Sequence, residues 1–278
     1  MTPAELLREV KRIELTTREL VRDLVAGDYT STFRGRGVEF AEVREYLPGD
    51  DVRTIDWNVT ARLGTPYVKR FHEERQLTLL LLVDMSASSG FGSVLRTKRE
   101  LAAEVSAVLS LAATRHRDRV GAVFYSDRIE WFAPPKSGRR QALQVVSQVL
   151  SFEPQGRGTD LLGTLDFLEP LLRQRAAVVL LSDFLDRSQW SALDRLAHRH
   201  DVMAMQLVDP RERELPPVGL VTLFDPETGN WETVDADLPE IRDGYRAARA
   251  EFDESFALHC NRAAVDLLGH HPSIVLWC

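Results

Sequence analysis

Apolar runs that alternate with amphipathic segments dominate the chain from residue 76 onward. The aliphatic run that ends at Asp84 contains four consecutive leucines and predicts a strand buried on both faces. Strands alternating with helices predict an α/β fold of the Rossmann type, in which a mostly parallel sheet is flanked by helices. The predicted strands cover residues 77–84, 120–125, 129–132, 176–181 and 202–208, and the predicted helices cover residues 97–115, 139–150, 161–172 and 188–199.

The N-terminal quarter of the chain has a different pattern. Thr2-Pro3-Ala4-Glu5 combines an N-cap, a proline in the first turn and a capping-box glutamate, and predicts a helix that runs to about Ala26. Residues 28–75 are rich in turn formers and charges, which indicates irregular structure with short strands such as 65–71. We therefore divide the chain into an N-terminal segment, 1–75, packed on an α/β domain, 76–278.

The C-terminal part of the α/β domain adds a hairpin and a long helix. Residues 218–224 and 231–234 flank the turn sequence Asp225-Pro226-Glu227-Thr228-Gly229-Asn230, which predicts a β-hairpin. Pro239 opens a long helix, and residues 274–277 predict a final short strand.

Charge and composition narrow the class of protein. Lys and Arg total 35 against 42 Asp and Glu, a net charge of −7, and the basic residues are dispersed, so nucleic acid is disfavoured as a partner. The longest apolar run is too short to span a bilayer, and the N-terminus lacks a signal-peptide core, so we expect no transmembrane segment. The two cysteines, Cys260 and Cys278, cannot form a disulfide framework, and we expect a cytoplasmic protein.

Oxygen-bearing side chains gather where the predicted central strand ends. Asp84, Ser86 and Ser88 alternate there, and ligands of open α/β sheets bind beyond the carboxyl ends of such strands. Two other predicted loops offer Thr159, which follows a glycine-rich turn, and Asp183, which follows a second buried strand. Hydroxyl and carboxylate oxygens suit Mg²⁺, and the absence of His or Cys beside them in the sequence argues against zinc.

Together these five residues resemble the metal-ion-dependent adhesion site of von Willebrand factor A domains. The pattern of that site is Asp-x-Ser-x-Ser with a distant Thr and a distant Asp, matched here by Asp84, Ser86, Ser88, Thr159 and Asp183. The resemblance implies a bound Mg²⁺ or Mn²⁺. The carboxylates of Asp84 and Asp183 would hold that ion through water molecules. The ion would then keep an open position for a carboxylate of another protein.

Several motifs outside that site resemble the bacterial domain-of-unknown-function 58 family, which precedes a von Willebrand A-like body with a characteristic block. The resemblance covers nearly the whole chain. It implies that the protein acts with a MoxR-type AAA+ ATPase and with other von Willebrand A proteins. The motifs are Gly37-x-Glu39-Phe40, Arg44-x-Tyr46-x-Pro48-Gly49-Asp50-Asp51-x-Arg53-x-Ile55-Asp56-Trp57, Ala61-Arg62, Val68-Lys69, Glu73-Glu74-Arg75, Val208-Asp209-Pro210, Glu214-Leu215-Pro216 and Asp225-Pro226-Glu227-Thr228-Gly229.

The charged block before residue 75 has two interpretations. Its aspartates and arginines could form a network of ion pairs around Trp57 that holds the segment to the sheet. Alternatively, the block could be a docking surface for the ATPase, with Arg34 and Arg36 at exposed tips.

Three functions are compatible with the sequence. The favoured one is a non-catalytic, Mg²⁺-dependent adaptor module that binds proteins. A phosphoryl-transfer or hydrolytic enzyme using Asp84 is the main alternative, although position 86 is Ser where many phosphatases have a second carboxylate. The sequence also contains neither a Gly-x-Ser-x-Gly elbow nor a phosphate-binding Gly-Lys-Ser/Thr loop. A metal-free structural scaffold is the third possibility.

Overall fold

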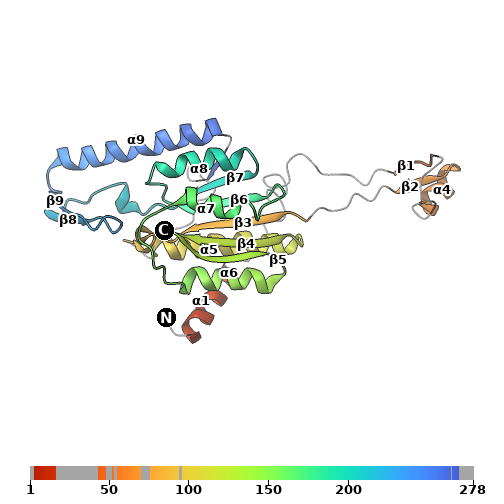
Figure 1. Ribbon diagram of the computed structural model, residues 1–278, viewed down its shortest axis with the longest axis horizontal. Coiled ribbons are helices and arrows are strands. Elements are labelled where there is room, and N and C mark those ends of the chain that lie inside the picture. The colour runs from red at the N-terminus through yellow and green to blue at the C-terminus, as the bar shows by residue number, and fades with distance from the viewer. Residues whose placement is uncertain are drawn as a thin grey trace.

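A six-stranded sheet with helices on both faces forms the body of the computed structural model (Figure 1). The structure describes residues 3–16, 43–47, 52, 55–69, 76–93, 96–263 and 265–268. The strands of the sheet are β3 (Thr78–Asp84), β4 (Arg119–Tyr125), β5 (Ile129–Ser137), β6 (Ala177–Ser182), β7 (Asp201–Gln206) and β10 (Asp266–Leu268). Only β5 runs antiparallel to its neighbour among these strands. The von Willebrand A-like α/β fold expected from the sequence is confirmed.

The order of the strands creates a switch point in the middle of the sheet. The spatial order is β10-β7-β6-β3-β4-β5, so the chain builds outward from β3 in one direction and then returns to build outward from its other side, starting with β6. Doubly wound sheets of this order bind ligands in the crevice where the direction reverses. The carboxyl ends of β3 and β6 therefore mark the place to look for a site.

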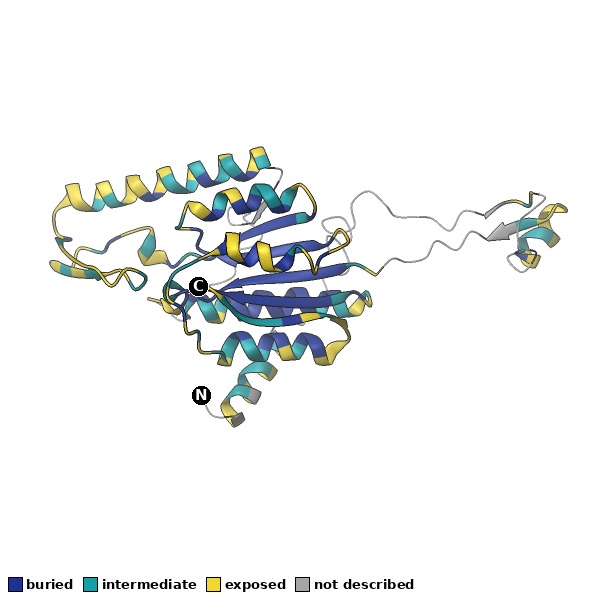
Figure 2. Cartoon of the chain, viewed as in Figure 1, coloured by how far each residue is buried: buried dark blue, intermediate teal, exposed yellow. Residues whose placement is uncertain are grey.

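The core lies on both faces of β3, whose seven residues are all buried (Figure 2). Leu79, Leu81 and Val83 pack on one face, and Leu80 and Leu82 pack on the other, as the two-residue period of a strand requires. The first face is covered by α5 (Lys98–Arg115) and α6 (Arg139–Ser151), and the second by α7 (Leu161–Leu168), α8 (Ser188–Ala197) and α9 (Pro239–Ala263).

Most predicted strands and helices of the α/β domain are confirmed, and two differ for reasons that involve proline. α7 ends at Leu168 rather than at residue 172, because Pro170 cannot continue the helical hydrogen bonds. β5 continues through Pro134 and Pro135 to Ser137, which an edge strand tolerates because one of its sides needs no backbone donors. The predicted strand at residues 274–277 lies outside the described residues.

The N-terminal helix packs on the body as expected. α1 (Pro3–Thr16) contacts α5 and α6, and its Ile13 is buried in the core. Glu14 of α1 accepts a hydrogen bond from the guanidinium of Arg139 on α6. The remainder of the predicted helix, up to Ala26, lies outside the described residues.

A small unit follows, which the sequence predicted only in part. β1 (Val43–Glu45) pairs antiparallel with β2 (Tyr67–Lys69), and α4 (Trp57–Leu63) packs on β2; Figure 1 draws these three elements apart from the sheet. Asp56 caps α4 by accepting hydrogen bonds from two backbone amides of its first turn, and Trp57 is 70 % exposed. Most of the aspartates and arginines of the predicted ion-pair network lie outside the residues whose side chains the structure describes, so that network stays a prediction. Arg34 and Arg36 lie outside the described residues.

None of the described helices is both long enough and apolar enough to cross a membrane.

The packing of β3 leads to a prediction about stability. Leu81 is fully buried at the centre of the sheet, so Leu81→Ala should lower the free energy of unfolding by about 2–5 kcal/mol through lost burial and the cavity left behind. Leu258→Ala, on the exposed side of α9, is the matched control and should change it by less than about 0.5 kcal/mol. Urea unfolding measures both; equal effects would mean that β3 is not the central strand.

Candidate metal centre

The candidate site lies at the switch point, where β3 and β6 end side by side. Val83 and Leu181 are register partners, so Asp84 and Ser182 are the next residues of two adjacent parallel strands. The Ser182 hydroxyl donates a hydrogen bond of 2.6 Å to Asp84 Oδ2. The 4 % exposure of Asp84 shows that this carboxylate sits at the floor of the site rather than on its rim.

A tight loop brings both serines of the Asp-x-Ser-x-Ser motif over the end of β3. The Ser86 amide donates to Asp84 Oδ1 at 2.8 Å, which turns the backbone directly after the strand, and a short 3₁₀ helix, η2 (Ala87–Gly90), follows. The hydroxyl oxygens of Ser86 and Ser88 lie 3.1 Å apart. The alternation predicted from the sequence thus places both hydroxyls on one side of the loop.

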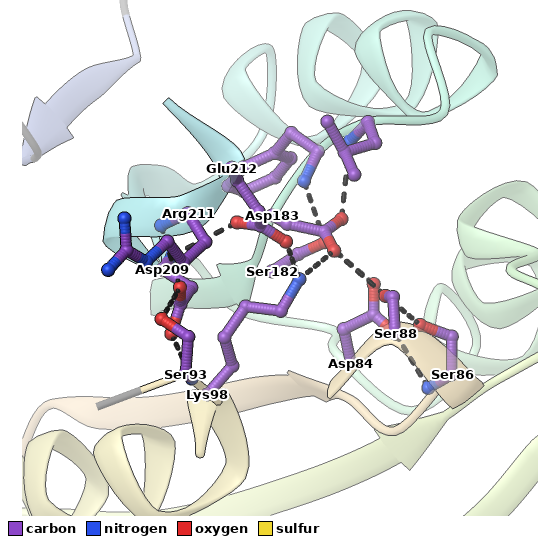
Figure 3. A network of polar contacts seen from close by, with 12 residues as sticks. Asp84, Ser86, Ser88, Ser93, Lys98, Ser182, Asp183, Asp209, Arg211 and Glu212 are labelled. Atoms are coloured by element: carbon purple, nitrogen blue, oxygen red, sulfur yellow. Dashed lines mark hydrogen bonds and ion pairs between the residues drawn. The ribbon is translucent and has the colours of Figure 1, made fainter. Parts of the chain in front are cut away.

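Asp183 joins this group from the end of β6. The Ser88 hydroxyl donates to Asp183 Oδ2 at 2.8 Å, although the two residues are 95 positions apart in the chain (Figure 3). Asp183 Oδ1 accepts the Leu185 amide at 3.2 Å. The structure therefore brings Asp84, Ser86, Ser88 and Asp183 together.

Thr159 lies on the loop that borders the serines. The Ala87 amide donates to the carbonyl of Arg157 at 2.9 Å, which ties this loop to the one that carries Ser86 and Ser88. Gly156 lets the loop come close to β4, because a Cβ there would lie 2.2 Å from Ser126 Oγ. In the described part of the chain, however, no hydrogen bond joins Thr159 to the other four residues.

A buried lysine, which the sequence analysis did not single out, contacts the site from the start of α5. The Lys98 ammonium lies 2.7 Å from Asp183 Oδ2 and 2.6 Å from Glu212 Oε1, and its side chain is only 3 % exposed (Figure 3). Burial alone would lower the pKa of Lys98, but the charges of Asp183 and Glu212 outweigh it and raise the pKa. Lys98 is therefore a fixed cation that holds the Asp183 carboxylate in place.

Glu212 is itself held by a second short 3₁₀ helix, η3 (Pro210–Glu212). Glu212 Oε2 accepts the Asp209 amide at 3.0 Å, and Asp209 Oδ2 accepts the Ser93 amide at 2.7 Å. This chain of contacts links the segment after β7 to the loop before α5. Its effect is to pack η3 against the site through Lys98.

The surroundings of Asp84 disfavour the ionised form of its carboxyl group. Burial raises the pKa of Asp84 to about 6, and the neighbouring charge of Asp183 adds to the shift, while hydrogen bonds from Ser182 and Ser86 oppose it. Among the described residues, Asp84 has no ion pair. A buried carboxylate without a cation is costly, and an added cation would reverse that cost.

Glu227 adds a further carboxylate from an unexpected direction. It lies in the turn between β8 (Leu220–Phe224) and β9 (Trp231–Asp235), and the neighbouring hydroxyls of Ser86 and Ser88 oppose the rise in its pKa. Burial raises the pKa of Glu227 to about 7, with further contributions from the charges of Asp84 and Asp183. The signal in the sequence was the Asp225–Gly229 segment, which we interpreted only as a turn and a family motif.

The donor set fits a hard divalent cation. Carboxylate and hydroxyl oxygens are the ligands preferred by Mg²⁺ and Mn²⁺. In the described ranges, no three His, Cys, Asp or Glu side chains lie where they could hold a metal ion by themselves, so a cation here would depend on the hydroxyls of Ser86 and Ser88. The use of two serine hydroxyls as ligands is also the distinctive feature of the metal-ion-dependent adhesion site that the sequence resembles.

The fold and this arrangement of oxygens define a von Willebrand factor A-like α/β protein. The chain belongs to the family described as protein of unknown function DUF58, whose model matches residues 42–255. It is 35 % identical over 249 residues to the uncharacterized protein Rv1480 of Mycobacterium tuberculosis, a match that covers 88 % of this chain and 78 % of the relative. It is also 37 % identical over 122 residues to the uncharacterized protein MAV169 of Mycobacterium avium, covering 42 % and 70 % of the two chains.

Two solved structures have a similar arrangement of elements at low sequence identity. One is the conserved hypothetical protein BatB from Bacteroides thetaiotaomicron, with a TM-score of 0.48 and 14 % identity over 71 % of this chain and 92 % of that one. The other is an aerotolerance-related membrane protein from Bacteroides fragilis, with a TM-score of 0.47 and 14 % identity over 70 % and 92 %.

The raised pKa of Asp84 predicts that the site lowers the stability of the metal-free protein. The shift from 3.8 to about 6 corresponds to a cost of roughly 3 kcal/mol when the carboxyl is ionised in both the folded and the unfolded states. Asp84→Asn removes this charge, but it keeps only one of the two oxygens that accept hydrogen bonds from Ser86 and Ser182. The variant should therefore raise the free energy of unfolding in EDTA at pH 8 by about 1–3 kcal/mol.

The sign of the pH dependence follows from the direction of the shift. As the pH falls through 6 the folded wild type binds a proton at Asp84 before the unfolded chain does, so its disadvantage against Asp84→Asn shrinks. Urea unfolding between pH 5 and pH 8 measures this, and the advantage of the variant should be about 1.4 kcal/mol smaller at pH 5 than at pH 8. A variant that is no more stable than wild type at pH 8, or an advantage that does not vary with pH, would contradict the prediction.

Proposed function

We propose that this protein is a non-catalytic, Mg²⁺-dependent interaction module whose metal-ion-dependent adhesion site receives a carboxylate from a partner protein. Asp84, Ser86, Ser88 and Asp183 would hold the cation, with Thr159 contributing from the adjacent loop. The bound cation supplies an electrophilic position for an outside acid. The observation that carries the proposal is the convergence of both serine hydroxyls with two carboxylates at the switch point of the sheet.

The balance of charge supports a divalent ion. Asp84, Asp183 and Glu212 carry three negative charges against one positive charge on Lys98, so these four groups sum to −3 + 1 = −2 when ionised. A divalent cation would cancel that charge. Because Asp183 Oδ2 is already shared between Lys98 and Ser88, we propose that Asp183 acts on the ion through a water molecule or the Ser88 hydroxyl.

The geometry favours binding over phosphoryl transfer at Asp84. Both of its carboxylate oxygens already accept hydrogen bonds, from the Ser86 amide and from the Ser182 hydroxyl, and the side chain is almost completely buried. A carboxylate that attacks phosphorus needs a free oxygen and a line of approach. Asp84 is better suited to positioning the serines and attracting a cation.

The partner that the family resemblance implies is a MoxR-type AAA+ ATPase, together with other von Willebrand A proteins. Such an assembly would operate in the cytoplasm, where the ATPase has access to ATP. The small unit formed by β1, α4 and β2 exposes Trp57 and Leu63, and we propose that it is a second contact surface for these partners.

The proposal predicts that the purified protein binds Mg²⁺ and Mn²⁺. Isothermal titration should give a one-site binding curve for wild type and no binding heat for Asp84→Ala, because that change removes the buried carboxylate of the site. Asp243→Ala, an exposed carboxylate on α9, is the control and should bind like wild type. Wild type that gives neither heat nor a thermal shift with either ion would favour the metal-free scaffold.

Binding to the ATPase should depend on the same site. Tagged wild-type protein should retain a MoxR-type ATPase in Mg²⁺ and release it in EDTA, and Asp84→Ala should fail to retain it in either buffer. The circular dichroism spectrum of the variant should match that of wild type, which separates lost binding from lost folding. Retention of the ATPase by the Asp84→Ala variant in EDTA would contradict the proposal.

A further inference from the structure

Lys98 occupies a position that the electrostatics of its own helix disfavour. It is the first residue of α5, directly after the N-cap Thr97, and the positive end of a helix dipole favours anions over cations. Its amide donates to the carbonyl of Phe91 at 2.9 Å, and its side chain is buried. A buried ammonium is tolerated at this position only because acids neutralise it.

The acids that neutralise Lys98 come from two separate segments. The ammonium lies 2.7 Å from Asp183 Oδ2, at the end of β6, and 2.6 Å from Glu212 Oε1, in η3 (Figure 3). Both contacts are charge-assisted hydrogen bonds, so one positive charge is divided between two carboxylates. A change that loosens one of the contacts therefore leaves more of the charge of Lys98 for the other carboxylate.

Asp183 is the acid that Lys98 shares with the candidate metal centre. Its Oδ2 also accepts the Ser88 hydroxyl at 2.8 Å, and its Oδ1 accepts the Leu185 amide at 3.2 Å, so both oxygens already have donors. In the part of the chain that the structure describes, no three His, Cys, Asp or Glu side chains could hold a metal ion by themselves. A cation at this site would therefore draw on a carboxylate that Lys98 already neutralises in part.

We propose that Lys98 is an internal cation that competes with the divalent ion for the negative charge of Asp183, and that Glu212 sets the strength of this competition. The inference rests on the function proposed above and adds the regulation of its metal affinity. In the metal-free protein Lys98 supplies part of the positive charge that the ion would bring. Because Glu212 belongs to η3, a movement of η3 away from Lys98 would leave the whole charge of the lysine on Asp183 and lower the affinity for metal.

Competition and a purely structural role of Lys98 make opposite predictions. If Lys98 only orients Asp183 for the ion, its removal weakens metal binding; if it competes with the ion, its removal strengthens binding. The charges of Asp84, Asp183, Glu212 and Lys98 sum to −3 + 1 = −2 when ionised. Without the charge of Lys98 the sum is −3, and without the charge of Glu212 it is −2 + 1 = −1. The two changes should therefore shift the affinity for a divalent ion in opposite directions.

The first test is the affinity of Lys98→Met for Mn²⁺, measured by isothermal titration. This change removes the ammonium and keeps an unbranched side chain. Binding should become about tenfold tighter or more, because a buried site gains one unit of negative charge. Lys136→Met makes the same change at an exposed position of β5, in register with Val120 at the opposite end of the sheet, and should bind like wild type. Unchanged or weaker binding by Lys98→Met would overturn the proposal.

Glu212→Gln decides the question even if Lys98→Met does not fold. With this acid neutral, the charge of Lys98 falls mainly on Asp183, and Mn²⁺ binding should weaken by about threefold or more. Glu214→Gln makes the same change two positions along the chain, at an exposed residue paired with Arg246, and should bind like wild type. Unchanged or tighter binding by Glu212→Gln would also overturn the proposal. Thermal melts in EDTA establish that each variant is folded.

The same titrations distinguish this inference from the proposed function. Wild type that binds Mn²⁺, with Lys98→Met binding no more tightly, leaves the metal centre standing and removes only the competition. Wild type that binds no Mn²⁺, with Lys98→Met binding it, contradicts the proposed function and supports the competition, because the lysine would then exclude the ion altogether. If neither protein binds Mn²⁺, both proposals fail.

Discussion

A carboxylate buried where two parallel strands end is the constraint on which the rest of this site depends. Asp84 could not remain there without the hydrogen bonds from Ser86 and Ser182, and those bonds shape the loop that carries both serines. The same burial keeps the negative charge of Asp84 and Asp183 from being screened by water. The fold thus gathers buried negative charge at its switch point, and a divalent cation would neutralise that charge.

Lys98 neutralises only part of that charge. By bridging Asp183 and Glu212, the lysine ties together α5, the end of β6 and η3 (Figure 3). Its single charge is shared between two carboxylates, so Asp84 gains little from it. Lys98 fixes the structure around the site, and the negative charge that remains would attract the divalent ion that we propose. Lower stability of the metal-free protein is the expected cost of such a site.

The sequence predicted those parts of the site that depend on local order. The alternation of Asp84, Ser86 and Ser88 follows directly from the end of a buried strand, and Asp183 follows from the end of the next strand of the same kind. Lys98, Glu212 and Glu227 could not be found in this way, because each reaches the site from a separate segment whose direction is set by tertiary packing. The hairpin itself was predicted, but nothing in its turn sequence says which way the tip faces.

Short elements were the other failures of prediction, again for physical reasons. α4 has only seven residues and buries none of them, so its sequence carries no apolar periodicity and only the caps at Asp56 and Gly64 mark its ends. β10 has three residues, and it gains its place by pairing with the edge of β7 rather than from its own composition. Elements that depend on a neighbour for their stability leave little trace in the chain.

Anomalous diffraction from crystals grown with Mn²⁺ would test the central claim most directly. The account predicts one strong peak at coordination distance from the hydroxyls of Ser86 and Ser88, between Asp84 and Asp183. A peak elsewhere on the molecule, or clear density for these side chains with no peak among them at saturating Mn²⁺, would contradict it.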